Sequence, residues 1–208
     1  MDTLTASVEA VVFDIGGVLV DWDPRHLYRT MFDDPEEMER FLAEVCSPEW
    51  HAPHDRGVST AESCADLARR LPEHADRIWA WSSRSEEMVA GEIPGTASIV
   101  EELVEAGRRC YALTNMEAET YPRRRERFAF FDLFEGVVVS GLEEVSKPEL
   151  EIFRRLLERY ALDARTTLFV DDNAANVEAA ASLGMQTVRF ESADLLRARL
   201  EELGLLEA

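Results

Sequence analysis

The chain has 208 residues, of which 46% are hydrophobic and 31% are charged, and its formal net charge is −20 at pH 7. This composition supports a packed core and excludes an intrinsically disordered protein. The acidic charge argues against nucleic acid and anionic membranes as partners, because binding to either depends on a basic face. Small phosphorylated molecules are compatible with it, since a bound cation and one lysine can reverse the local field.

The cysteines and the apolar runs indicate the cellular compartment in which the protein is expected. Cys46, Cys64 and Cys110 are an odd number without metal-type spacing, so we expect reduced thiols. The first residues lack a basic start followed by an apolar segment, and no apolar run approaches the roughly 18 to 20 residues that span a bilayer. A cytoplasmic protein is therefore expected.

The first expected element is a buried strand at residues 11–14, a short apolar run that ends in Asp14. Residues 23–93 contain helical patterns but no convincing buried strand, which predicts a helical insertion. Prolines punctuate this interval at expected helix starts: Pro24, Pro35, Pro48 and Pro72. Its core is expected from the large apolar residues Leu67, Ile78, Trp79, Trp81 and Met88.

Strands and helices then alternate to the end of the chain. The expected elements are strand 110–115, strand 137–140, helix 149–160, strand 167–172, helix 176–183 with Gly184 as its cap, and strand 186–190. This alternation predicts an α/β fold with a doubly wound parallel sheet. Residues 1–22 and 94–208 would form its core, and residues 23–93 the insertion.

Polar side chains end four of the predicted strands: Asp14, Thr114 with Asn115, Ser140, and Asp171 with Asp172. In an open parallel sheet, ligands bind outside the carboxyl ends of the strands. Each of these residues alone could be a helix cap or a turn residue. Together they predict a functional site at one edge of the sheet.

These residues lie in four motifs that resemble those of the haloacid dehalogenase-like superfamily. The motifs are Phe-Asp-Ile-Gly-Gly-Val at 13–18, Leu-Thr-Asn at 113–115, Ser-Lys-Pro at 146–148, and Val-Asp-Asp-Asn at 170–173 followed by Asn176. The resemblance implies a Rossmann-like core with a helical cap of the first type at residues 23–93. It is closest to sugar-phosphate phosphatases and to the phosphatase domain of soluble epoxide hydrolase.

The resemblance implies a magnesium-dependent hydrolase of small phosphorylated metabolites, in which Asp14 attacks phosphorus and forms an aspartyl-phosphate. Thr114 and Lys147 would stabilise charge on the transferring group. Substrate contacts would come from Gly16, Gly17, Asn115 and the cap-loop residues Trp50, His51 and His54. We expect no nucleic acid or membrane partner, and a monomer or homodimer.

The carboxylates require a cation, because they would otherwise repel one another and the phosphate. Mg²⁺ fits oxygen ligands and keeps substrate phosphate among its ligands. The resemblance assigns Asp14, the backbone carbonyl of Gly16 and Asp172 as ligands. Asp171 would pair with Lys147. Asn176 would hold the site residues in position without binding the metal itself.

The chain departs from the family at Gly16, where most of its phosphatases carry an aspartate that protonates the leaving group. Asp21 could replace it or could be a solvated loop carboxylate. His51 and His54 could form a metal pair, but no acidic or cysteine ligand accompanies them at a fitting spacing. A dehalogenase, a catalytically weak binding or scaffold protein that has lost its acid, and a phosphosugar mutase are the alternatives to a phosphatase.

Overall fold

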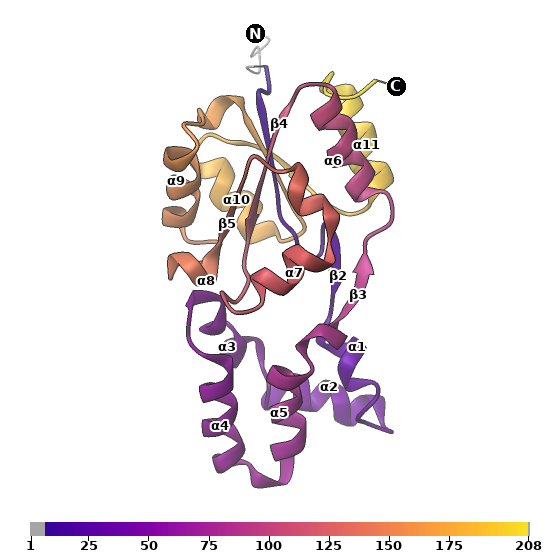
Figure 1. Ribbon diagram of the computed structural model, residues 1–208, viewed down its shortest axis with the longest axis vertical. Helices are drawn as coiled ribbons and strands as arrows, with labels where there is room; N and C mark the ends of the chain where they lie inside the picture. The colour runs from indigo at the N-terminus through magenta and orange to yellow at the C-terminus, as the bar shows by residue number, and fades with distance from the viewer. Residues whose placement is uncertain (1–6, 208) are drawn as a thin grey trace.

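The computed structural model describes residues 7–207. Five parallel strands form the central sheet in the order β5-β4-β1-β6-β7 (Figure 1). Their bounds are β1 Ala10–Phe13, β4 Arg109–Thr114, β5 Gly136–Val139, β6 Thr167–Asp171 and β7 Gln186–Arg189. All five predicted strands are present, each within one residue of its expected bounds. The predicted α/β class with a doubly wound parallel sheet is confirmed.

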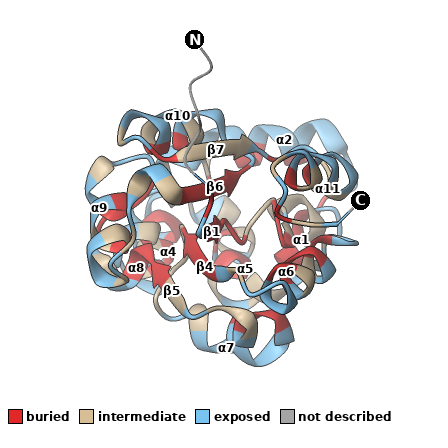
Figure 2. Cartoon of the chain, turned by 90° about the horizontal axis from the view of Figure 1, so that it is seen from above, coloured by how far each residue is buried: buried red, intermediate tan, exposed pale blue. Residues whose placement is uncertain are grey.

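Helices cover both faces of this sheet, and successive strand side chains point to opposite faces. Val11 and Phe13 of β1 pack with α6 (Thr96–Glu105) and α11 (Ala193–Glu202). Val12 packs on the other face with α9 (Leu150–Arg159) and α10 (Ala174–Ser182). Figure 2, a view from above the molecule as drawn in Figure 1, shows the buried strands β1, β4 and β6 between partly exposed helices, with the edge strand β7 of intermediate burial. Burial on both faces explains why the strands are continuously apolar.

The remaining core helices are short. They are α7 Tyr121–Arg127, η4 Ala129–Leu133, α8 Ser140–Glu143 and η5 Ala164–Thr166. The predicted helix starts and stops are supported by local chemistry at α10: the side chain of Asn173 accepts a hydrogen bond from Ala175 N, and Gly184, at φ +87°, follows the last turn. The three cysteines are buried free thiols.

A second helical layer lies at one end of the sheet, at the bottom of Figure 1, and we call it the cap. Its elements are α1 Pro24–Tyr28, α2 Pro35–Glu44, α3 Pro48–His51, η1 His54–Arg56, α4 Thr60–Arg70, η2 Pro72–His74, α5 Ala75–Ser83 and η3 Ser85–Met88. Each of the prolines singled out in the sequence opens one of these helices. Proline suits this position because its missing N–H would have no helical acceptor there.

The cap has its own hydrophobic core, in which Tyr28, Phe41 and Trp81 pack ring against ring. Four of the five residues expected there are buried, but the prediction for Trp79 is wrong, because that residue is 42% exposed. Trp79 and Trp81 are two positions apart on α5, so they point to different sides of the helix.

The chain enters and leaves the cap through an antiparallel pair, β2 (Val20–Trp22) and β3 (Val89–Glu92). The insertion was predicted to be helical without a buried strand, and β3 adds to it a short strand that is mostly unburied. Only Val89 of β3 is buried, so the strand carries no apolar run in the sequence. In the described chain, residues 7–207, no helix is long and apolar enough to cross a membrane.

Candidate active site

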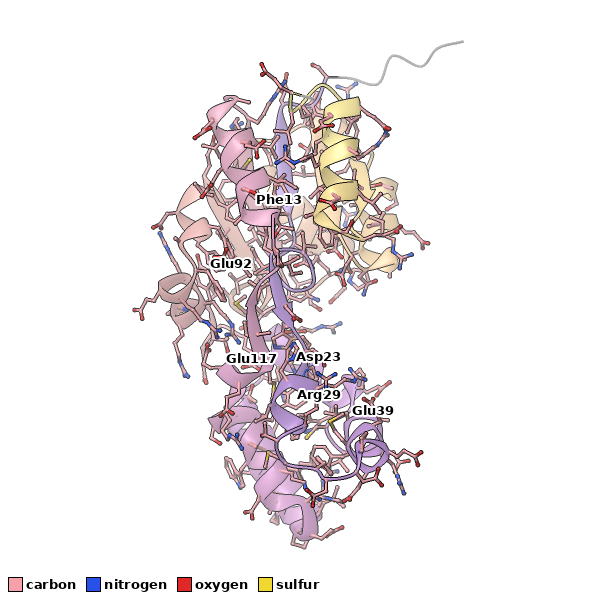
Figure 3. The ribbon with its side chains drawn as sticks, turned by 90° about the vertical axis from the view of Figure 1, so that its right-hand side faces the viewer. Phe13, Asp23, Arg29, Glu39, Glu92 and Glu117 are labelled. Atoms are coloured by element: carbon pink, nitrogen blue, oxygen red, sulfur yellow. The ribbon has the colours of Figure 1, made fainter. Side chains whose placement is uncertain are left out.

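A cavity of about 420 Å³ lies where the carboxyl edge of the sheet faces the cap. From the core, Asp14, Thr114 and Lys147 line it. From the cap and the β2–β3 pair, the lining includes His51, Asp55, Trp22, Trp81 and Met88. Figure 3 shows Glu117, which also lines the cavity, at the level where core and cap meet. The strand-end residues predicted to gather at one edge do so.

Asp14 follows β1 and is held by a backbone hydrogen bond from its own N to Val170 O, 2.9 Å. Its Oδ1 lies 2.8 Å from Lys147 Nζ and accepts a bond from Ile15 N at 2.7 Å. Burial raises the pKa of Asp14 to about 7, with the Asp171 carboxylate adding to the rise and Lys147 opposing it. The ionised form of Asp14 therefore depends on positive charge close to it, and Lys147 supplies such a charge.

Lys147 is the only lysine in the sequence. It is 3% exposed, and its Nζ lies 2.7 Å from Asp171 Oδ2 as well as beside Asp14. Burial lowers the pKa of Lys147, but the two carboxylates outweigh that effect and the net shift is upward. The ammonium is thus charged and bridges two carboxylates.

Asp171 is fully buried and its acceptor positions are filled. Asn176 Nδ2 donates to both carboxylate oxygens, at 3.1 and 3.0 Å, and Asn173 N donates to Oδ1 at 2.8 Å. These bonds fix the carboxylate that in turn holds Lys147.

Asn115 positions the backbone of Lys147. Its side-chain amide donates to Lys147 O at 3.0 Å and accepts from Lys147 N at 2.9 Å. This paired contact uses both ends of the amide, so Asn115 holds the lysine loop in place, and the residue also lines the cavity. Thr114 is 1% exposed and lines the cavity; its Oγ1 makes one long bond, 3.5 Å to Asn115 O.

Oxygen ligands for a metal gather beside Lys147. Carboxylate oxygens of Asp14, Asp171 and Asp172 lie within 4.8 Å of one another. Three carboxylates face one ammonium, so the group has an excess of negative charge that a divalent cation would balance. The donor set suits Mg²⁺, which prefers carboxylate oxygens.

The two glycines after Ile15 differ in their surroundings. A Cβ on Gly17, whose φ is +76°, would lie 2.6 Å from Asp172 Oδ2, so only glycine lets the loop approach that carboxylate. A Cβ on Gly16 would meet nothing within 4 Å. Position 16 therefore has room for the side chain that this sequence lacks.

The cap loop brings one of its three predicted substrate-binding residues to the cavity. His51 lines it, whereas Trp50 and His54 are not among the described residues that do. Trp50 packs edge-on against Trp81 and His54, and His54 is 1% exposed. The structure places these two residues in the packing behind His51, which argues against direct substrate contact.

The two histidines contact each other, with Nδ1 to Nδ1 at 3.4 Å. Burial lowers the pKa of each to about 4, so both imidazoles are neutral at pH 7. The structure also brings Glu117, from the loop after β4, within 4.8 Å of both. Sequence spacing could not reveal this neighbour, because the segments are 63 or more residues apart.

Asp21 lies away from the reacting groups. Its Oδ1 is 3.0 Å from His26 Nε2, its side chain is 49% exposed, and it is not among the described cavity-lining residues. Of the two interpretations, the solvated loop carboxylate fits this placement.

Comparisons with known proteins extend these observations. The family model for haloacid dehalogenase-like hydrolases matches residues 8–184. A sesquiterpene phosphatase of Aspergillus oryzae is 29% identical, over 88% of this chain and 89% of its own. A phosphorylated carbohydrates phosphatase of Thermotoga maritima is 26% identical, over 87% of this chain and 84% of its own.

The chain belongs to the haloacid dehalogenase-like hydrolases. The family resemblance of the four motifs is thereby confirmed. A solved magnesium complex of a family enzyme from Bacteroides thetaiotaomicron shares the fold, with a TM-score of 0.71 and 20% identity over 92% of this chain and 99% of that one.

This hydrolase also carries cavity residues that the motifs did not indicate. Arg124 of α7 is 4% exposed, lines the cavity and pairs with Glu86 of η3 at 2.7 Å. Glu117 is a second such residue. The run Tyr-Pro-Arg-Arg-Arg-Glu-Arg at 121–127 is an available signal for Arg124, since it concentrates basic residues in a strongly acidic chain.

Proposed function

We propose that the protein is a magnesium-dependent phosphatase that hydrolyses phosphomonoesters of small metabolites through Asp14. The observation that carries the proposal is the placement of Asp14 at the cavity wall, 2.8 Å from the buried ammonium of Lys147 and grouped with Asp171 and Asp172. The phosphatase names of two relatives that match most of this chain support the same reaction.

In this reaction a carboxylate oxygen of Asp14 forms a bond to phosphorus as the ester P–O bond breaks. Water then attacks phosphorus, the bond to Asp14 breaks, and phosphate leaves. Lys147 meets negative charge on the phosphoryl oxygens, and the Thr114 hydroxyl is placed in the same wall to donate to them. Asn115 and Asp171 hold the lysine in position.

Mg²⁺ would be held by Asp14 and Asp172, with the Gly16 carbonyl as the expected backbone ligand, and would supply positive charge for phosphate binding. The unbalanced carboxylates around Lys147 support this assignment. Gly17 supports it too, because its lack of a side chain lets Asp172 lie beside the loop.

The apolar part of the cavity lining suits substrates with an apolar body. Trp22, Trp81 and Met88 contribute large apolar surfaces there. A sugar phosphate, the substrate class suggested by the sequence, would use the polar side chains that line the same cavity, among them Ser85, Thr120 and Arg124. The sesquiterpene phosphatase relative supports an apolar body, and the carbohydrate phosphatase relative supports a sugar.

A phosphate-release screen tests the function. Sugar phosphates, short-chain alkyl and isoprenoid phosphates and an aryl phosphate should be compared with Mg²⁺ and with chelator, beside Asp14→Asn. Phosphate release that needs both Mg²⁺ and Asp14 supports the proposal. Chloride release from haloacids would instead favour the dehalogenase, which needs no metal-binding carboxylate pair. No turnover in either screen would favour the binding or scaffold protein.

A further inference from the structure

The proposed reaction needs a proton for the departing ester oxygen, and none of the residues assigned above donates it. A simple alkoxide is a poor leaving group, so phosphate transfer from an alkyl ester needs a proton on the departing oxygen. Gly16 cannot supply it, because it has no side chain. Three groups on or near the cap are candidate donors: Asp21, His51 and Asp55.

Two of the three do not suit the role. Asp21 is bonded to His26 and lies outside the described cavity lining. His51 lines the cavity, but its burial keeps it neutral at pH 7, so it lacks the readily released proton of an imidazolium.

Asp55 meets the geometric requirements. It lies in η1, lines the same cavity as Asp14 and Lys147, and its side chain is 17% exposed. It belongs to the cap, whereas Asp14 belongs to the strand ends of the core, and it lies near enough to Lys147 for that ammonium to lower its pKa. A leaving group that points away from the nucleophile points toward the cap, as in-line displacement requires.

The loop that carries Asp55 is tied to the core on both sides of Lys147. Arg56 Nε donates to Ser146 Oγ at 3.0 Å, and Arg56 Nη2 lies 3.1 Å from Glu149 Oε1. Because Arg56 follows Asp55 directly, these contacts fix the acid relative to the lysine. Gly57 extends the contact, since a Cβ there would lie 3.1 Å from Gly141 O of the core.

Burial favours the protonated form of Asp55 near neutral pH, and the charged groups around it act in both directions. Burial raises the pKa of Asp55 to about 7, and the Glu117 carboxylate adds to the rise, while Lys147 and Arg56 lower it. The remaining titratable neighbour, His51, has its Nε2 3.9 Å from Asp55 Oδ1 and is uncharged. A carboxyl group in this state can give a proton and later take one back.

We propose that Asp55 of the cap is the general acid and base that replaces the missing carboxylate at position 16. This inference rests on the phosphatase function proposed above. As Asp14 bonds to phosphorus, the Asp55 carboxyl transfers its proton to the ester oxygen and an alcohol leaves. The Asp55 carboxylate then accepts a proton from the water that attacks phosphorus, which releases phosphate and restores both aspartates.

A leaving-group series tests this role. Values of kcat/KM for aryl, fluoroalkyl and alkyl phosphates, plotted against leaving-group pKa, should give a shallow slope for the unmodified protein. Asp55→Asn should steepen it: we expect roughly 10²- to 10⁴-fold loss on alkyl phosphate, the usual size of general acid catalysis, and little loss on aryl phosphate. Asp55→Ser, which also cannot donate as an acid, should give the same slope.

A rescue variant separates chemistry from packing. Gly16→Asp has room for its side chain and should restore alkyl phosphate turnover in the Asp55→Asn protein. Asp21→Asn serves as the matched control and should leave the slope unchanged. Melting temperatures identify any variant that has lost its fold.

The outcomes are distinct. A slope unchanged by both Asp55 variants overturns the role of Asp55 but leaves the phosphatase function intact. Equal losses on aryl and alkyl esters, without rescue by Gly16→Asp, would assign Asp55 to cap positioning and also overturn it. If the unmodified protein hydrolyses no phosphomonoester, the proposed function fails and this inference fails with it.

Discussion

The core and the cap line the same cavity but hold their polar side chains differently. In the core, Lys147 bridges Asp14 and Asp171, and further hydrogen bonds fix each partner. Burial raises the pKa of Asp14 in the core and of Asp55 in the cap alike, to about 7, but Asp14 contacts the Lys147 ammonium, whereas the histidine beside Asp55, His51, is neutral. Fixed charges suit the stabilisation of a transferring phosphoryl group, whereas a group that is easily protonated suits proton transfer.

The core side of this comparison predicts the largest effect. Asp14→Asn should lower kcat by at least about 10⁴-fold, because a neutral amide cannot replace the carboxylate as nucleophile. Steady-state phosphate release measures it, with Asp163→Asn as the control, since Asp163 is exposed beside Arg165 on a loop before β6. Asp172→Asn should raise the Mg²⁺ concentration needed for half-maximal activity. Full turnover by Asp14→Asn would refute its assignment as the nucleophile.

Lys147→Ala tests whether the core charges also hold the fold. Loss of the Lys147 ammonium leaves two buried carboxylates without their shared cation. The free energy of unfolding should therefore fall by about 3–5 kcal/mol, and the activity should fall too. Urea unfolding measures the change. Arg165→Ala, which breaks an exposed and solvent-screened pair with Asp163, should change the free energy of unfolding far less. Equal effects of the two substitutions would contradict the picture of a bridging ammonium.

The pH dependence of stability tests whether the cap residue Asp55 is protonated near neutral pH. The pKa of Asp55 rises from 3.8 to about 7 on folding, so between these values the folded protein binds the extra proton and stability falls as pH rises. Asp55→Asn removes this loss and should stabilise the metal-free protein at pH 8 by up to about 4 kcal/mol, but not at pH 4. Urea unfolding at both pH values, with Asp21→Asn as control, checks the sign.

The smallest effect concerns substrate choice. His51→Ala removes a ring from the cavity wall and should change the ratio of kcat/KM between an isoprenoid and a sugar phosphate by about tenfold, the size of a modest lost contact. Trp50→Ala should instead mainly lower the melting temperature, because Trp50 packs against Trp81 and His54. Identical changes in both variants would show that the loop acts only as packing.

The sequence predicted the core better than the cap for a physical reason. Buried parallel strands are continuous apolar runs that can be recognised in the sequence. Asp14, Thr114 and Asp171 stand at the carboxyl ends of these runs, so they could be recognised with them. The cap residues that face the site belong to short turns whose orientation depends on packing. Trp50 and His51 are neighbours in sequence, yet only His51 lines the cavity.

Contacts between distant segments account for the other differences. Strand β3 carries no apolar run, because one face of the β2–β3 pair is solvated. Glu117 and Arg124 reach the cavity through a loop and helix outside the four motifs. The pKa of Asp55 depends on Glu117, 62 positions away in the chain, and no local pattern could indicate it.

The single lysine has a consequence for chemical labelling. An amine-reactive reagent finds one side-chain amine in this sequence, and in the folded protein that amine is 3% exposed and held by two carboxylates. Acylation of Lys147 therefore requires a state in which the site has opened and the ammonium has lost its proton. Its rate, followed by the mass of the peptide that contains Lys147 so that acylation of the N-terminal amine is not counted, measures how often the active site opens, without a substrate or an added probe residue.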